Sequence, residues 1–410
     1  MQASTPWYAP PIAHKPQTIA IIGAGLAGMS LAYALTQKNF KVLLIDQAAT
    51  LPSGASRNQV ALIKPQLSPD HNLPDQYITQ AFLNFSDFIK DYPELILSQG
   101  ILELAHSKKL QMRHQGIMEK RELNHLANYV NSEQASELAG IALSHAGLYF
   151  HNAFLLDVPA YYQTLQKLCG DHLQIIHAQK VKALTHQDEQ WLLQADSSIT
   201  ADAVIFAHGY QGFEDYIDCN TLIPCPGQLS FIQPATSTPL KCTLTFEGYL
   251  TPALHGQHIL GASFRHNEDT EIHAHDHEQN LEYLGKIAPD LKTILGTAPS
   301  HNWCAMRVTS TDHLPLLGGV PIKAIWLKDY ERIKFGDFRA RQYPNCTYYP
   351  NLYMSLAHGS KGVISSFYAG QILAHLIDNK TIITAPKVWQ AIHPARFWLR
   401  ALRSNDNGKN

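Results

Sequence analysis

Three glycines and one aspartate near the N-terminus have residue types and spacing that could bind a nucleotide. Gly23, Gly25 and Gly28 follow the spacing GxGxxG, and Asp46 comes 18 residues after the last of them. Such glycines allow a tight turn and a close approach of the backbone to a pyrophosphate, while the carboxylate accepts hydrogen bonds from ribose hydroxyls. The pattern therefore predicts a dinucleotide site. The acid favours FAD or NAD over NADP, and the motif alone does not distinguish the first two.

The residues around the glycines predict the elements that would position this site. Residues 19–22 are a short apolar run typical of a buried strand, a helix follows to about Lys38, and residues 41–45 predict a second strand. The phosphates would then lie at the N-terminus of the helix, where backbone N–H groups are free. The cofactor-binding residues predicted in this unit are Gly23, Ala24, Gly25, Leu26, Ala27, Gly28 and Asp46.

A small polar loop follows the second predicted strand. It could offer backbone N–H groups and a hydroxyl to a phosphate or a sugar, and the alternative is an ordinary surface loop. The residues predicted to bind the cofactor here are Gly54, Ala55, Ser56, Asn58 and Gln59.

A second glycine turn lies late in the chain. Residues 351–377 repeat the opening pattern of strand, glycine turn and helix, so another positive helix end is expected at the other end of the same cofactor. The binding residues predicted here are His358, Gly359, Ser360, Lys361, Gly362 and Val363.

The rest of the chain predicts a second domain interleaved with the first. Helices are expected over residues 76–97 and 117–139, and residues 221–300 carry strand signals typical of a mostly antiparallel sheet that could wall a substrate pocket. Asp157 is expected to cap a helix that ends near Gly170. Three short strands at hairpin spacing are then expected near residues 173–176, 181–185 and 191–194, before a buried strand at 203–206.

The fold class predicted is α/β, a Rossmann-like FAD-binding domain with an interleaved α+β substrate domain. The expected division is a tether at 1–17, an FAD-binding domain at 18–80, 146–215 and 304–410, and a substrate domain at 81–145 and 216–303.

Composition limits the kinds of partner and compartment. The 410 residues carry a net charge near −2, so a nucleic acid would have to be held by a local basic patch rather than by the overall field. The six cysteines show no framework spacing, the N-terminus has no signal pattern, and no apolar stretch is long enough for a membrane span. A cytoplasmic protein is expected. His273, His275 and His277 could suggest a metal, but among Glu271, Asp276 and Glu278 a solvated polar cluster is the preferred interpretation, so no metal is predicted.

Several motifs taken together resemble a known family. The two glycine turns are similar to those of the FAD-dependent D-amino-acid-oxidase-like superfamily. Within it, the chain resembles the oxidoreductase domain of bacterial bifunctional tRNA 5-methylaminomethyl-2-thiouridine biosynthesis proteins. The motifs that carry this resemblance are residues 54–59 with Pro65 and residues 67–68, residues 248–253, Arg307 with residues 312–315, residues 359–362 and residues 394–397.

The resemblance implies both cofactor and reaction. It implies FAD, with the backbone near Val181 and Gly209 close to the cofactor, and oxidation of a carboxymethylaminomethyl group at C5 of a tRNA wobble uridine, with O2 as electron acceptor. Arg307 would bind the substrate carboxylate, its alternative being a surface or interdomain ion pair, and Lys361 is the second predicted catalytic residue. No methyltransferase-like segment precedes residue 1, so a standalone oxidase with a possible separate methyltransferase is expected. Arg57 and Lys64 depart from the family pattern.

Competing functions remain open from the sequence. One is an oxidase of a small free amino acid such as glycine or sarcosine; another is a nicotinamide-dependent dehydrogenase or a catalytically silent flavin-binding module. Late basic residues interleaved with aromatics favour a tRNA partner, with a solvated rim as the alternative. These residues are Tyr330, Arg332, Lys334, Phe335, Phe338, Arg339, Arg341, Tyr343, Arg396, Phe397, Trp398, Arg400 and Arg403.

Overall fold

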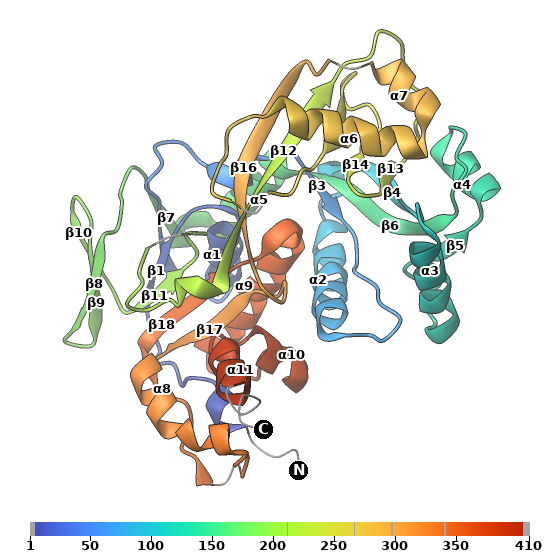
Figure 1. The fold of residues 1–410 in the computed structure, drawn as a ribbon. Helices are drawn as coiled ribbons and strands as arrows, with labels where there is room; N and C mark the ends of the chain where they lie inside the picture. The colour runs from blue at the N-terminus through green and yellow to red at the C-terminus, as the bar shows by residue number, and fades with distance from the viewer. Residues whose placement is uncertain (1–4, 211, 266, 297, 340–341, 405–410) are drawn as a thin grey trace. The chain divides into compact units, whose positions relative to one another are not determined.

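The computed structural model describes residues 5–210, 212–265, 267–296, 298–339 and 342–404. The chain forms two compact units, each assembled from separate stretches of sequence (Figure 1). Unit 1 comprises residues 1–56, 162–223 and 308–410, and unit 2 comprises residues 57–161 and 224–307. No helix among the described residues is long and apolar enough to cross a membrane.

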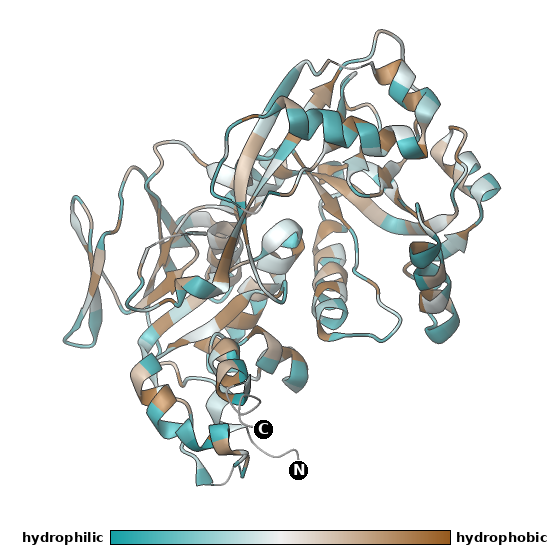
Figure 2. Cartoon of the chain, viewed as in Figure 1, coloured by the Kyte–Doolittle hydropathy of each residue, from teal (hydrophilic) through white to brown (hydrophobic). Residues whose placement is uncertain are grey.

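A six-stranded, mainly parallel sheet forms the centre of unit 1. Its order is β17-β18-β11-β1-β2-β7, and only the edge strand β17 runs antiparallel to its neighbour. Apolar residues follow these strands, as expected for a sheet covered on both faces (Figure 2). The strands are β1 (Thr18–Ile22), β2 (Lys41–Ile45), β7 (Leu173–Ile176), β11 (Ala203–Phe206), β17 (Leu316–Pro321) and β18 (Tyr348–Leu356).

Two helices from opposite parts of the chain pack closely in unit 1. They are α1 (Leu26–Thr36) and α9 (Gly362–Ile377), and they lie side by side in Figure 1. A Cβ atom on Gly370 would come within 2.8 Å of the Ser30 carbonyl oxygen, and the hydroxyls of Ser30 and Ser366 lie 3.3 Å apart. Small residues therefore let the two helix backbones approach closely. The helix predicted after the first glycine turn is confirmed by α1.

The predicted hairpin strands separate into two sheets. The first, β7, pairs in parallel with β2 in the main sheet, so its expected place in a hairpin was wrong. The other two, β8 (Ala183–Gln187) and β9 (Gln190–Gln194), form an antiparallel sheet with β10 (Ser198–Ala201). The β7 segment is only four residues long, and its pattern does not show whether its partner is local or distant.

A larger, mostly antiparallel sheet forms unit 2, as the strand signals predicted. Its order is β16-β12-β15-β14-β13-β4-β6-β3, with β5 beside β6, and β13 pairs with β4 in parallel. The outer strands β12 (Leu222–Ile232) and β16 (His301–Ser310) extend past the unit boundary. The other strands are β3 (Val60–Ile63), β4 (Ile96–Leu104), β5 (Asn128–Val130), β6 (Gly147–Asp157), β13 (Thr243–Thr245), β14 (Tyr249–Leu250) and β15 (His258–Gly261).

Two helix predictions in unit 2 need correction. The helix expected over 76–97 is α2 (Leu73–Ile89), which ends before Pro93, and β4 begins at Ile96. The helical region expected at 117–139 is split by β5. The remaining helices are α3 (Lys108–Lys120), α4 (Ser132–Ala139), α6 (Ala274–Ile287) and α7 (Pro289–Leu295). The cap predicted for α5 (Val158–Cys169) is present, because the Ala160 amide donates to Asp157 Oδ1 over 2.9 Å.

The N-terminal segment is packed rather than a free tether. Trp7 is only 4% exposed, and the Trp389 indole N–H donates to the Tyr8 carbonyl over 2.9 Å. Aromatic residues explain why a proline-rich segment docks there. The surrounding elements are α8 (Lys323–Asp329), η6 (Glu331–Phe335), α10 (Pro386–Ile392) and α11 (Arg396–Ser404).

The boundaries of the units differ in part from the expected domains. Residues 57–80 and 146–161 group with unit 2, because β3 and β4 both pair with β6. The functional role of each unit remains a prediction.

Candidate functional site

Three glycine turns lie along one edge of the sheet in unit 1. The strands β1, β11 and β18 are parallel neighbours, so their carboxyl ends meet at the same edge. Gly23, Gly209 and Gly359 follow these three ends with φ values of +102°, +84° and +60°. Ligands of open α/β sheets bind at such an edge. The structure thus brings together predicted residues from distant parts of the sequence.

The first turn is built tightly enough to require its glycines. A Cβ on Gly28 would overlap the Gly23 carbonyl oxygen, and a Cβ on Gly25 would lie 2.8 Å from Ser56 Oγ. The same hydroxyl accepts a hydrogen bond of 2.9 Å from the Leu26 amide. Because Gly25 is the residue before α1, this arrangement places a helix N-terminus directly behind the turn.

Asp46 lies beside this turn at the carboxyl end of β2. Its carboxylate is 9% exposed and accepts hydrogen bonds of 2.7 Å from the Ala24 amide and 2.8 Å from the Ala48 amide. The Gln179 amide donates to the Asp46 carbonyl over 2.9 Å, which brings the chain leading to Val181 alongside. Val181 itself is buried in the core with neighbours from β1 and β2.

The late turn is fixed by a half-buried histidine. The two ring nitrogens of His358 lie 2.9 Å from Ser355 Oγ and 2.9 Å from Ser365 Oγ, so the side chain joins the end of β18 to α9. Burial lowers the pKa of His358 to about 4, which keeps the ring neutral near pH 7. Gly359–Lys361 form one short helical turn, and α9 begins at Gly362. A contact of this turn with a cofactor would thus come from its backbone rather than from the imidazole.

Another histidine at this edge was not singled out from the sequence. His208 follows β11, and a Cβ on Gly23 would lie 2.6 Å from its Cα atom. Burial lowers its pKa to about 4, so this ring is also neutral near pH 7. The feature of the sequence that could have identified His208 is its position directly before Gly209.

These groups fit FAD. The tight turn that admits no Cβ at Gly23, Gly25 or Gly28, the carboxylate at the end of β2 and the two helix N-termini behind glycine turns are what a dinucleotide requires. Other predicted cofactor-binding residues also belong to unit 1, either in the glycine turns at this edge or in the loop whose Ser56 hydroxyl bonds the first turn. They are Ala24, Ala27, Gly54, Ala55, Ser360 and Val363.

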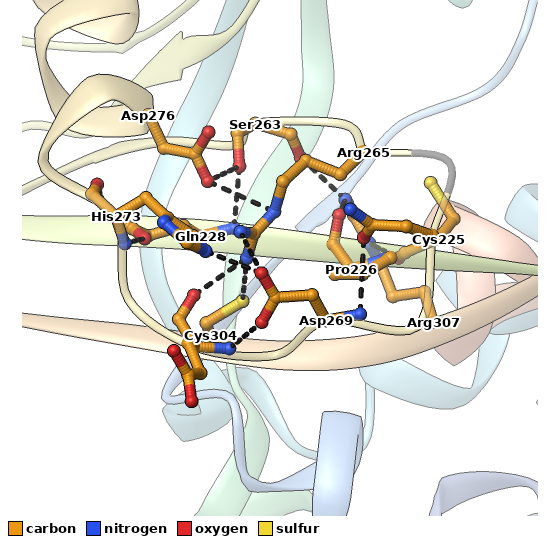
Figure 3. Close-up of polar contacts among 12 residues, drawn as sticks. Cys225, Pro226, Gln228, Ser263, Arg265, Asp269, His273, Asp276, Cys304 and Arg307 are labelled. Atoms are coloured by element: carbon orange, nitrogen blue, oxygen red, sulfur yellow. Dashed lines mark hydrogen bonds and ion pairs between the residues drawn. The ribbon is translucent and has the colours of Figure 1, made fainter.

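Arg307 lies in unit 2, where its guanidinium meets backbone carbonyl oxygens and the ring of Phe264. Its guanidinium donates to the carbonyls of Ser263 (2.9 Å), Pro226 (3.4 Å) and Cys225 (3.4 Å; Figure 3). Within the described residues, no carboxylate lies within ion-pair distance of it. Burial lowers its pKa, but a guanidinium stays protonated at neutral pH. This uncompensated cation suits a carboxylate or another small anion.

A network that the sequence did not reveal holds the residues around Arg307. Ser263 Oγ donates to Asp276 Oδ2 over 2.9 Å and accepts from the Gln228 amide over 3.1 Å, and Asp276 also lies 3.4 Å from Arg265 Nε (Figure 3). A Cβ on Gly227 would overlap the Arg307 guanidinium. A glycine inside a predicted strand was the signal available for that close approach.

Three further predicted or noted residues belong to unit 2. Asn58 and Gln59 were expected to bind the cofactor, but they belong to unit 2, whereas the glycine turns belong to unit 1. Their contact with the cofactor remains a prediction. The Asn58 side-chain oxygen is buried and has no hydrogen-bond partner among the residues that the structure describes. Lys64 forms an ion pair with Glu103, whose other oxygen lies 3.2 Å from His114 Nε2.

The histidine cluster at residues 273–277 is partly buried rather than solvated. His277 is buried with its Nδ1 atom 2.8 Å from Ser230 Oγ, while His273 Nε2 lies 2.6 Å from Asp269 Oδ2. These side chains turn to different partners. Among the residues that the structure describes, no group of three potential ligands is placed to hold a metal ion. All six cysteines are free thiols.

The late basic and aromatic residues divide into a buried and an exposed set. Arg396 is 1% exposed and pairs with Asp312 through two hydrogen bonds of 2.9 Å, so its expected place on an RNA-binding surface was wrong. Tyr330 and Trp398 are also buried. The exposed set, which we call the basic-aromatic patch, is Arg332, Phe335, Phe338, Arg339, Arg400 and Arg403, whereas Lys334, Tyr343 and Phe397 are half-buried. Arg341 lies outside the described residues.

Comparisons with known proteins connect this site to a family. Residues 18–376 match the DAO family, described as FAD dependent oxidoreductase. The chain is 31% identical over 405 residues to the tRNA 5-methylaminomethyl-2-thiouridine biosynthesis bifunctional protein MnmC of Legionella pneumophila, with 96% of this chain and 59% of that protein aligned. It therefore spans about three fifths of that protein's length.

Solved structures show the same fold at lower identity. The L-proline dehydrogenase of P. horikoshii superposes with a TM-score of 0.72 at 17% identity, covering 95% of this chain and 98% of that one. Glycine oxidase of Bacillus cereus gives a TM-score of 0.68 at 18% identity, covering 89% and 96%.

Proposed function

Because the chain belongs to the FAD-dependent oxidoreductase family, we propose that it oxidises the carboxymethylaminomethyl group at C5 of a tRNA wobble uridine. The products would be the aminomethyluridine and glyoxylate. The observation that carries this proposal is the 31% identity, across 96% of the chain, to a protein named for tRNA modification. Such a substrate is found in the cytoplasm, and the proposal includes that location.

The cofactor would be held by unit 1. Residues 23–28 and Asp46 would bind the ADP half, and residues 358–363 would meet the flavin half through backbone N–H groups. When bound, FAD supplies an acceptor for a hydride and passes the electrons to O2. Lys361, the last residue of the short helical turn before α9, is proposed as a catalytic residue at the flavin half.

Arg307 would bind and orient the substrate carboxylate. A guanidinium fork matches a carboxylate bidentately, and its backbone partners leave its charge uncompensated by any acid among the described residues. Holding the carboxylate fixes the adjacent methylene, from which the hydride leaves while the amine loses its proton. Water then adds to the resulting imine, which separates into the amine and glyoxylate.

The basic-aromatic patch would bind tRNA phosphates. Arg332 and Arg339 are 67% and 66% exposed and share the partner Asp337, so phosphate could replace this partner at little cost. Phe335 and Phe338 offer exposed rings with Lys334 and Arg403 above them.

Nucleoside mass analysis of tRNA from cells lacking this protein tests the function. Accumulated carboxymethylaminomethyl-uridine would support it, and restoration by the wild-type protein would link the change to this chain. An unchanged nucleoside profile, together with turnover of glycine or N-methylglycine by the purified protein, would instead identify an oxidase of small free amino acids.

A further inference from the structure

Phe264 is an exposed aromatic residue at the Arg307 site. Its side chain is 57% exposed, although large apolar side chains usually gain stability from burial. The Arg307 Cζ atom lies 4.4 Å from the centre of its ring. A ring that rests on a guanidinium and is still more than half exposed has much of its surface available to a ligand.

The backbone on both sides of Phe264 is held in place. Ser263 is buried, and its hydroxyl is bonded to Asp276 and to the Gln228 amide (Figure 3). The Arg265 amide donates to the Pro226 carbonyl over 3.3 Å, and its side chain reaches Cys304 Sγ at 3.3 Å. The exposed ring therefore extends from a fixed support, which reduces the entropy lost when a ligand stacks on it.

We propose that Phe264 is the stacking surface for the pyrimidine ring of the substrate nucleoside. This inference rests on the proposed function, because it names the residue that contacts the base of that substrate, whereas Arg307 binds its carboxylate. Only a short methylene–amine–methylene arm joins the carboxylate to the pyrimidine, so a carboxylate on Arg307 brings the base close to the ring beside it. Aromatic side chains stack on bases whatever their sequence context. A small free amino acid such as glycine or N-methylglycine has no ring to stack, and Phe264 thus selects the nucleoside.

Competitive inhibition of tRNA oxidation tests this subsite. The inhibitors are 5-carboxymethylaminomethyluridine, which has the base, and N-methylglycine, which has only the amine and carboxylate. Phe264→Leu should raise the inhibition constant of the nucleoside by about 10-fold or more and leave that of N-methylglycine within about 2-fold. Phe264→Tyr, which keeps an aromatic face, should behave as the wild type. Tyr283→Leu is the matched control, because Tyr283 also lies in unit 2 with a cation 5.3 Å from its ring centre and belongs to no proposed binding site.

The outcomes separate this inference from the function beneath it. If the wild type does not oxidise the modified tRNA, the proposed function fails and the subsite falls with it. If the wild type is active but Phe264→Leu binds the nucleoside normally, only the subsite is overturned. An equal loss for both inhibitors would show that Phe264 merely supports Arg307, which would also overturn it.

Discussion

Replacing Arg307 by alanine should leave FAD bound and slow substrate oxidation by about 10²–10³-fold. Two charge-assisted hydrogen bonds to the carboxylate would be lost, and at about 1.5–2 kcal/mol each they amount to about 3–4 kcal/mol of barrier. Flavin content should not change, because Arg307 belongs to unit 2 and the glycine turns to unit 1. Arg307→Lys should recover little activity, since an ammonium cannot form the fork.

Gly227→Ala offers an independent test of the same guanidinium. The added methyl group would overlap Arg307, so the arginine would have to move although its own identity is unchanged. We expect a loss of the same kind, mostly in the rate of flavin reduction measured by anaerobic stopped-flow absorbance. Wild-type rates of flavin reduction in Arg307→Ala would show that Arg307 does not bind the substrate. Loss of flavin from that variant would show that residues outside unit 1 also hold the cofactor.

Four further predictions follow from the same geometry. Acid precipitation should release all flavin into the supernatant, and Gly28→Val should give a colourless protein; flavin retained in the pellet would contradict non-covalent binding. Neutralising Arg332 and Arg339 together should weaken tRNA binding. It should also reduce the slope of the logarithm of the binding constant against the logarithm of salt concentration by about one unit per lost phosphate contact. Neutralising the exposed, ion-paired Lys286 in unit 2 is the control, and it should change neither the affinity nor this slope. Arg396→Ala should destabilise the fold by about 3 kcal/mol in denaturant titrations, because the buried carbonyls of Leu314 and Pro315 lose their donor and Asp312 keeps only its more exposed cationic partner Arg400. Arg403→Ala should not, and equal stability would argue against a structural role. Burial lowers the pKa of His358 in the folded protein to about 4, so the neutral ring contributes to stability near pH 7. This contribution is lost as the pH falls from about 6.5 to 4, because the unfolded chain then binds a proton that the folded protein does not. His358→Gln should therefore flatten that part of the curve of unfolding free energy against pH.

The predictable part of the site was the part that local sequence determines. The GxGxxG spacing, the following helix and Asp46 are contiguous, and the structure places Asp46 2.7 Å from the Ala24 amide as a turn of this kind requires. The second glycine turn was also visible as strand, turn and helix. Its position at the same sheet edge depends on the pairing of β11 with both β1 and β18, which no local pattern shows.

The wrong predictions concern residues whose environment is set by distant partners. Arg396 looked like a surface cation because basic residues on a short helix usually are, but Asp312 lies 84 positions earlier in the chain and draws it into the core. Likewise, β7 is separated from β2 by more than 100 residues in the sequence, so its partner could not be inferred from the strands that follow it. Asp276 looked solvated and is buried because Ser263 turns toward it.

The contact between α1 and α9 has a consequence for the order in which the molecule can assemble. The hydroxyls of Ser30 and Ser366 meet across 336 positions, so α1 cannot reach its final packing until α9 has been synthesised. At about 5–20 residues per second, the ribosome needs roughly 17–67 s to make that stretch. During this interval the first glycine turn and its apolar helix lack their closing partner. Nascent chains should therefore be vulnerable to proteolysis and chaperone binding at the N-terminus, and should become able to retain flavin only late in translation.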